Sequence, residues 1–340
     1  MDGNRRLKVA VVGATGLVGE AMLQVLAERG FPAREVVALA SERSAGELVG
    51  FGDDELLVQD LAQFDPAGTD IALFAASGEV AREYAPKFAA AGVVVIDNSS
   101  AWRMHPDVPL VVPEVNPEAA RTRPRGIIAN PNCSTIQLML VAGPIHREVG
   151  IERMNVASYQ SVSGAGREAL EELARQTADL LNGRPAEASA LPVQIAFNVI
   201  PHIDAFEPNG YTREELKIVN ESRKILGDDS IRVSATAVRV PVFYGHSEAV
   251  SVETRASLDA AAASALLARS PGVEVVDAGQ PGGYATAVTH ASGKDAVYVS
   301  RIRADLSHPQ GLNLWVVADN VRKGAALNAV QIAELVAAEA

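Results

Sequence analysis

Cysteine is almost absent from this sequence, since Cys133 is the only one among 340 residues. A single thiol excludes an intrachain disulfide and a zinc site built from several cysteines. Basic residues are also in deficit, because 30 Lys and Arg face 42 Asp and Glu and leave a formal net charge of −12. A chain of that sign repels nucleic-acid backbones and anionic membranes, so we expect neither as a partner.

Long hydrophobic runs are missing as well. Apolar stretches such as 93–96 have the length of a strand, whereas a membrane-spanning helix needs about 18 consecutive apolar residues. Residues 1–6 lead directly into a strand-like segment and contain no apolar core of a signal peptide. We therefore expect a cytoplasmic protein without a transmembrane helix.

Apolar residues make up 48% of the chain, and 340 residues exceed what one hydrophobic core usually serves, so two domains are expected. The first third alternates between strand and helix patterns. The predicted elements are strands at 8–12, 36–40, 71–75 and 93–96 and helices at 20–29 and 79–91. This alternation predicts an α/β domain, a Rossmann-type doubly wound parallel sheet covered by helices.

The pattern changes after residue 132. A helix at 134–146, a strand at 154–161 and a helix at 166–181 are followed mainly by strands, at 231–240, 248–254, 296–304 and 312–318. These runs predict a second, α+β domain with a largely antiparallel sheet. A final helix over 320–340 is expected to join the first domain, so the predicted boundaries are 1–132 with 320–340, and 133–319.

Glycines occupy the first, fourth and last positions of the segment 13–19, between the first strand and the first helix. Such a turn brings helix N-terminal N–H groups to a dinucleotide pyrophosphate, although a tight turn with nothing bound is the alternative. The second strand is followed by Arg43 and Ser44, which suit a ribose 2′-phosphate. NADP is therefore expected, with Glu42 as the neighbour that could favour NAD.

Cys133 follows a strand and a proline turn and precedes a helix, in the segment 130–135, Asn-Pro-Asn-Cys-Ser-Thr. The positive end of a helix dipole favours the thiolate, which is the nucleophilic form of cysteine. A lone cytosolic cysteine is more often a buried inert thiol, but this polar setting favours a nucleophile.

Together these motifs resemble bacterial aspartate-semialdehyde dehydrogenases over nearly the whole chain. The segments that carry the resemblance are 13–19, 97–103, 113–116, 130–135, 159–166, 245–248 and 319–326. The resemblance implies reversible conversion of aspartate semialdehyde, phosphate and NADP into aspartyl phosphate and NADPH. It also implies a place in lysine, threonine, methionine and isoleucine biosynthesis, and a homodimer.

The resemblance assigns the chemistry to three residues. Cys133 is the nucleophile that forms a thiohemiacetal and then an acyl-thioester, and His246 is the base that removes the hydroxyl proton. Gln160 fixes the substrate at the reacting carbon. On sequence alone, a glutamine near a strand end is ordinarily just polar surface.

Four further residues match substrate and phosphate contacts of the family. Arg239 clamps the substrate α-carboxylate and Glu214 contacts its ammonium group, whereas Arg103 and Lys217 bind phosphate. The alternatives are an outward-facing strand arginine for Arg239 and an exposed helix ion pair for Glu214 and Lys217. Thr212 and the residue three positions later are spaced as a capping box for that helix.

The cofactor contacts implied are Gly13, Thr15, Gly16, Leu17, Val18, Arg43, Ser44, Ser163, Gly164 and Asn320, and no metal is expected. Two other functions remain open on the sequence. One is a non-catalytic paralogue that serves as an interaction protein, which would be expected to lose Cys133 or His246. The other is a related acyl-phosphate reductase, which would carry different residues around its cysteine.

Overall fold

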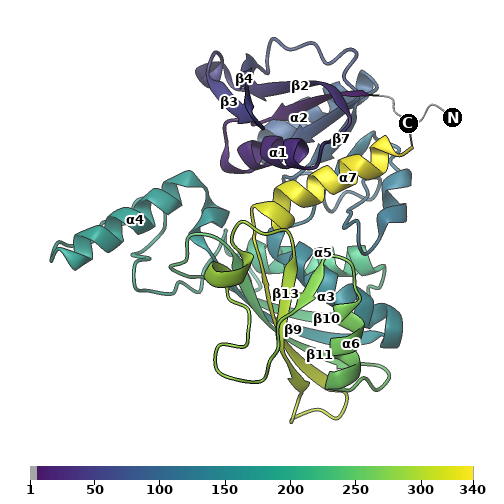
Figure 1. Cartoon of the computed structure of the whole chain (residues 1–340), viewed down its shortest axis with the longest axis vertical. Coiled ribbons are helices and arrows are strands. Elements are labelled where there is room, and N and C mark those ends of the chain that lie inside the picture. Colours follow the sequence, from purple (N-terminus) through teal and green to yellow (C-terminus); the bar gives the residue numbers. More distant parts are fainter. Residues whose placement is uncertain (1–5, 340) are drawn as a thin grey trace. The chain divides into compact units, whose positions relative to one another are not determined.

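The computed structural model describes residues 6–339. They divide into two compact units, of which unit 1 holds the residues up to Asn132 and those from Ala325 onward, and unit 2 holds Cys133–Gly324. Figure 1 shows the chain coloured along its sequence. Among the described residues, no helix has both the length and the apolar character that crossing a bilayer demands.

The described part of unit 1 is built on a six-stranded sheet in the order β5-β2-β1-β6-β7-β8, and every pairing in it is parallel. Its strands are β1 (Leu7–Val12), β2 (Ala33–Ala40), β5 (Gln59–Asp60), β6 (Ile71–Phe74), β7 (Val94–Asp97) and β8 (Ile127–Ala129). The helices are α1 (Leu17–Glu28), α2 (Gly78–Ala90) and α7 (Leu327–Ala337), and a hairpin joins β3 (Leu48–Phe51) to β4 (Asp54–Leu57). This sheet confirms the predicted doubly wound fold.

The apolar runs of these strands form the core of unit 1. Val9 and Val11 of β1 pack with Met22 of α1 and with Val330 of α7 in one buried cluster. Because helices cover a parallel sheet, its strands need side chains that are apolar on both faces. The order β2-β1-β6 means that the chain turns to opposite sides of β1, so the carboxyl end of β1 is the switch point where α/β sheets bind ligands.

The described part of unit 2 contains a second six-stranded sheet, in the order β10-β9-β11-β14-β13-β12. Its strands are β9 (Ile151–Gln160), β10 (Arg232–Arg239), β11 (His246–Thr254), β12 (Val273–Val275), β13 (Val297–Ala304) and β14 (Gly311–Ala318). The three inner pairings are antiparallel and the two outer ones are parallel, so the sheet is mixed. The helices of this unit are α3 (Cys133–Val149), α4 (Arg167–Leu181), α5 (Arg213–Leu226) and α6 (Ala260–Ala268).

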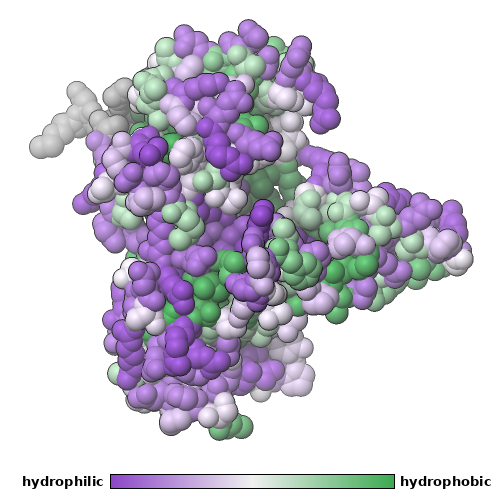
Figure 2. Space-filling model, turned by 180° about the vertical axis from the view of Figure 1, so that it is seen from behind, coloured by the Kyte–Doolittle hydropathy of each residue, from purple (hydrophilic) through white to green (hydrophobic). Residues whose placement is uncertain are grey.

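Helix α4 extends away from the mixed sheet of unit 2, as Figure 1 shows. Figure 2 shows apolar side chains on the surface of this projecting part. The exposed large apolar residues on α4 and in the segment that follows it are Leu181, Val193, Phe197, Val199 and Phe206. Large apolar side chains gathered at a surface are typical of a protein interaction site.

Two local expectations were wrong. The final helix does not begin at Asn320, because a π-helical turn covers Arg322–Ala326 and the α-helix α7 starts only at Leu327. The Asp319 carboxylate caps this turn by accepting hydrogen bonds from the backbone N–H groups of Val321 and Arg322, and the Gly324 backbone N–H donates to the Asp319 carbonyl five residues earlier, the spacing of a π-helix. The strand predicted at 248–254 begins two residues earlier, since His246 is the first residue of β11.

Candidate active site

Cys133 is the first residue of α3, and its sulfur lies 3.3 Å from Nε2 of His246, the first residue of β11. The two residues are 113 positions apart in the sequence, and the packing of α3 on the mixed sheet brings them together. A thiol at a helix start that touches an imidazole is the arrangement of a cysteine nucleophile and its base.

The ring of His246 is fixed by Ser161. Nδ1 lies 3.1 Å from the Ser161 backbone N–H, which donates to it, and 3.1 Å from the Ser161 hydroxyl oxygen. That hydroxyl itself donates to Asn320 Oδ1, so its oxygen can accept a hydrogen bond from Nδ1–H when Nδ1 is protonated. Ser161 therefore holds the ring in place whether or not Nδ1 is protonated, and Nε2 can change its protonation state.

Burial holds the pKa of His246 well below its ordinary value of 6.5, and the nearby Arg239 charge lowers it further, while a hydrogen bond to the Gly245 carbonyl acts in the opposite direction. The ring is therefore neutral at pH 7 and can accept one proton.

Asn320 organises the loop that follows β9. Its Oδ1 accepts from the hydroxyls of Ser161 and Ser163 and from the backbone N–H of Gly245, at 2.9–3.1 Å. The predicted cofactor contacts Ser163 and Asn320 thus belong to the network that orients His246. Gly164 lies against Arg239 and His246, because a Cβ there would come within 2.9 Å of Arg239 Nη1 and 3.3 Å of His246 Nε2.

The substrate-binding residues predicted in unit 2 converge on Cys133 and His246. Gln160 ends β9 and lies opposite Arg239, which ends the neighbouring parallel strand β10. The Gln160 amide donates to Glu214 Oε1 at 3.2 Å, and Glu214 lies in the first turn of α5. The capping box predicted for α5, between Thr212 and Glu215, is present, which leaves the neighbouring Glu214 for the site.

Arg239 is buried, with Nη1 donating to the Ser161 carbonyl at 2.8 Å. Its Nε is also buried and has no hydrogen-bond partner among residues 6–339, so it can serve a ligand. Burial lowers the pKa of Arg239, while the charges of Glu214 and Cys133 raise it. A guanidinium with donors to spare is suited to binding a carboxylate in the fork geometry that lysine lacks.

Lys217, one turn along α5, bridges two carboxylates. Its Nζ lies 2.7 Å from Asp204 Oδ2 and 3.1 Å from Glu214 Oε2. Burial lowers the pKa of Lys217, but Glu214 and Asp204 outweigh that effect and keep the pKa above its usual range.

Arg103, the other predicted phosphate ligand, belongs to unit 1. Its Nε donates to the Asn130 carbonyl at 2.9 Å and its Nη2 to the Asn98 carbonyl at 2.8 Å. These carbonyls follow β8 and β7, so the guanidinium is held at the carboxyl edge of the parallel sheet.

The glycine turn of unit 1 borders a cavity of about 570 Å³. Five predicted cofactor residues line it, namely Gly13, Thr15, Gly16, Arg43 and Ser44, whereas Leu17 and Val18 are not among the lining residues. Gly13 has a φ of 81°, and a Cβ there would lie 2.6 Å from the Ala75 carbonyl oxygen. A Cβ at Gly19 would overlap the Gly13 carbonyl oxygen, so both glycines are needed for this turn.

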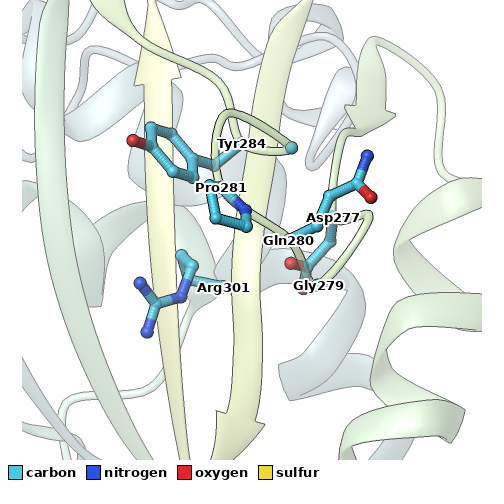
Figure 3. A pocket seen from close by; sticks show the side chains of 7 residues that line it. Asp277, Gly279, Gln280, Pro281, Tyr284 and Arg301 are labelled. Carbon is cyan, nitrogen blue, oxygen red and sulfur yellow. The ribbon is translucent and has the colours of Figure 1, made fainter.

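A second cavity, of about 350 Å³, contains none of the predicted site residues. Figure 3 shows Tyr284, Pro281 and Arg301 around it, with Asp277 at its other side. The Asp277 carboxylate accepts from the backbone N–H of Ile302, so its polar group already has a structural role.

Several residues close to Cys133, His246 and Lys217 were not predicted from the sequence. Gly324 packs on the nucleophile, since a Cβ there would lie 3.0 Å from Cys133 Cβ. Ser161 and Asp204 act through hydrogen bonds to His246 and Lys217, which no local pattern reveals. Gly324 lies inside the matched segment 319–326, so the motif was visible but the role of its glycine was not.

Glu248, two residues after His246 on β11, is a fully buried carboxyl group. Burial raises the pKa of Glu248 well above 4.5, and the Gln137 amide only partly offsets this increase. Neither Glu248 oxygen makes a hydrogen bond of normal geometry within the described chain. The folded state therefore holds a proton that the unfolded state loses above pH 4.5. The free energy of unfolding must then fall as the pH rises toward the folded-state pKa.

We expect Glu248→Gln to remove this dependence because glutamine does not titrate. The free energy of unfolding of the variant minus that of the parent should increase from pH 5 to pH 8, by at most about 1.4 kcal/mol per pH unit. Denaturant unfolding at four pH values measures this difference. A difference that stays constant with pH would mean that Glu248 is ionised in the folded protein.

Family models match both units. The model described as the NAD binding domain of semialdehyde dehydrogenase matches residues 8–123, and the one described as its dimerisation domain matches residues 142–323. Among known proteins, an aspartate-semialdehyde dehydrogenase of Legionella pneumophila is 59% identical over 99% of this chain and 97% of its own length. One from Aquifex aeolicus is 54% identical over 98% of both chains.

Solved structures agree with these matches. The crystal structure of Vibrio cholerae aspartate semialdehyde dehydrogenase II, complexed with ASA, has a TM-score of 0.95 and 56% identity and covers 98% of both chains. A Pseudomonas aeruginosa protein described as a probable aspartate-semialdehyde dehydrogenase has a TM-score of 0.93 at 40% identity.

Proposed function

Because the chain belongs to the aspartate-semialdehyde dehydrogenase family, we propose that it oxidises aspartate semialdehyde with NADP and phosphate through a thioester on Cys133. The observation that carries this proposal is the contact of Cys133 with His246, beside the opposite charges of Arg239 and Glu214. A free amino acid presents both a carboxylate and an ammonium group, and this pair matches them. The sulfur and the imidazole then lie where the aldehyde of the same molecule must react.

The first half of the reaction builds the thioester. The Cys133 thiolate adds to the aldehyde carbon, so that an S–C bond forms as the C=O π bond breaks, and the oxygen takes up a proton from solvent to become the hydroxyl of a thiohemiacetal. His246 Nε2 takes the hydroxyl proton as the C–H electron pair leaves, and its neutral ring is suited to that task. NADP, when bound, supplies the nicotinamide ring that accepts this hydride. Gln160, held by Ser158 and Glu214, positions the reacting carbon.

The second half releases the product. Phosphate attacks the thioester carbonyl, the C–S bond breaks, and the thiolate of Cys133 is restored. The proton on the attacking phosphate and the one on His246 go to solvent. Arg103 and Lys217 are the cations assigned to the phosphate, because a dianion that leaves water needs charge compensation.

The cavity at the glycine turn fits a dinucleotide, because Gly13 and Gly19 leave no room for side chains and the start of α1 offers N–H groups. Arg43 and Ser44 line it beside the end of β2 and are assigned to the 2′-phosphate of NADP. Glu42 also lines the cavity. Ser163, Gly164 and Asn320 are assigned to the nicotinamide side, and the backbone of Leu17 and Val18 to the pyrophosphate.

Arg43→Ala should raise the KM for NADP about tenfold or more while leaving the KM for NAD nearly unchanged, because only NADP carries the 2′-phosphate. Initial rates with each cofactor measure both values. Arg34→Ala is a matched control, since Arg34 pairs with Asp70 away from the cavity. Equal efficiency of the parent with NAD and NADP would contradict the NADP assignment.

We further propose that the protein is a cytoplasmic homodimer that serves lysine, threonine, methionine and isoleucine biosynthesis. The match of residues 142–323 to a dimerisation domain supports the dimer, as do the exposed apolar residues around α4. Unit 2 is then the catalytic and dimerisation domain, and unit 1 binds NADP.

A non-catalytic paralogue is disfavoured because Cys133, Gln160, Arg239 and His246 are all present in contact-forming positions. The test of the function is NADP reduction by aspartate semialdehyde with and without phosphate. We expect steady turnover only with phosphate. Equal steady rates in both conditions, or no reduction at all, would contradict the proposal.

A further inference from the structure

Asp204 is a residue for which the proposed chemistry has no use, yet it contacts a residue assigned to phosphate. Its Oδ2 lies 2.7 Å from Lys217 Nζ, which is closer than Glu214 Oε2 at 3.1 Å. The Lys217 ammonium therefore lies between two carboxylates, and its positive charge is more than compensated. An arriving phosphate meets this cluster and not an isolated cation.

The backbone presents Asp204 in a costly conformation. Its φ is 68°, in the left-handed region that non-glycine residues rarely adopt. The segment around it is pinned to the start of α5, because the Arg213 backbone N–H donates to the Ala205 carbonyl and Phe206 pairs with Thr212. The Asp204 carboxylate is thus held toward Lys217 by the fold.

The charge of Asp204 is maintained at neutral pH. Burial acts to raise its pKa, but hydrogen bonds from Lys217 and from the Ala205 backbone N–H outweigh burial and lower it. Asp204 is therefore an anion that occupies the ammonium group on which a phosphate oxygen would have to bind.

We propose that Asp204 is the built-in counter-ion of Lys217, which phosphate must displace before it attacks the thioester; this rests on the proposed phosphate role of Lys217. The Asp204 carboxylate repels a phosphate that binds to the same Lys217 ammonium group. Asp204 therefore competes with phosphate and weakens its binding. The substrate ammonium is assigned to Glu214, the second carboxylate on Lys217. Binding of the semialdehyde therefore removes one competitor and leaves Asp204 as the other.

Removing the Asp204 charge should strengthen phosphate binding without affecting the semialdehyde. We expect Asp204→Asn to lower the phosphate KM about threefold or more and to leave the semialdehyde KM within about twofold of the parent. Asp204→Gly should do the same, and glycine adopts this positive φ without strain, which guards against misfolding.

The matched control is Glu207→Gln. Glu207 lies on the same segment, but its carboxylate pairs with Arg213 at 2.7 Å and not with Lys217. Loss of the Glu207 charge should leave the phosphate KM unchanged. This control distinguishes the effect of the Asp204 charge on Lys217 from a general effect of net charge. NADPH formed in the first turnover without phosphate should also be unchanged in both Asp204 variants.

Lys217→Leu separates the two levels of the proposal. If it raises the phosphate KM while both Asp204 variants leave that KM unchanged or higher, the counter-ion role is overturned and the phosphate site stands. If Lys217→Leu itself leaves the phosphate KM unchanged, the phosphate assignment fails and the counter-ion role falls with it. Lower phosphate KM in both Asp204 variants, with Glu207→Gln unchanged, supports the proposal.

Discussion

Cys133→Ala should abolish turnover, lowering kcat by about 10⁴-fold or more, because no other thiol in the sequence can form the thioester. Cys133 lies in unit 2, whereas the glycine-turn cavity lies wholly in unit 1. NADP affinity should therefore stay within about threefold of the parent. Steady-state assays and cofactor titration measure the two quantities.

Cys133→Ser provides a second form of the same experiment, since it keeps a polar group at the start of α3 but offers a poorer nucleophile. It should also be nearly inactive. The matched control is Ser307→Ala, which removes an exposed hydroxyl group of the same unit whose hydrogen-bond partner is the Asp305 carboxylate. Substantial turnover in either Cys133 variant would rule out covalent catalysis.

His246→Asn should lower kcat by about 10²–10⁴-fold, the usual range for loss of a general base. The semialdehyde KM should change little, because the ammonium and carboxylate contacts belong to Glu214 and Arg239. His290→Asn is the control, since His290 is half-buried and hydrogen-bonded to Thr289 in the same unit.

The pH profile adds a second readout for His246. Its pKa lies well below 6.5 because the ring is buried and near Arg239, so its protonation should cost no activity between pH 6.5 and pH 8. Loss of kcat with an apparent pKa near 6.5, present in the parent and absent in His246→Asn, would contradict this environment for the ring.

The Rossmann-type sheet could be predicted from the sequence because each of its features is encoded in a short stretch of residues. A buried parallel strand is a short apolar run, and the glycine turn between β1 and α1 needs its glycines for steric reasons visible in the sequence. The π-helical turn at 322–326 was not predicted. It depends on hydrogen bonds to Asp319, and in the sequence Asp319 cannot be distinguished from any other polar residue that follows a strand.

The site was only partly predictable from the residues alone. Cys133 could be placed at a helix start from its flanking sequence, but its 3.3 Å contact with His246 depends on how α3 packs on β11. The register that sets Gln160 opposite Arg239 is likewise a property of the sheet. Family resemblance supplied the roles of these four residues but not their pairings, and the contacts of Ser161, Asp204 and Glu248 emerged only from the structure.

The most direct test of the covalent route is rapid mixing of the enzyme with NADP and aspartate semialdehyde in the absence of phosphate. We expect a burst of NADPH of at most one equivalent per active site, followed by slow hydrolytic turnover. We also expect an acyl adduct on Cys133 in the mass spectrum of the quenched protein, and steady turnover once phosphate is added. A first turnover that itself requires phosphate, with no adduct on Cys133, would contradict the thioester.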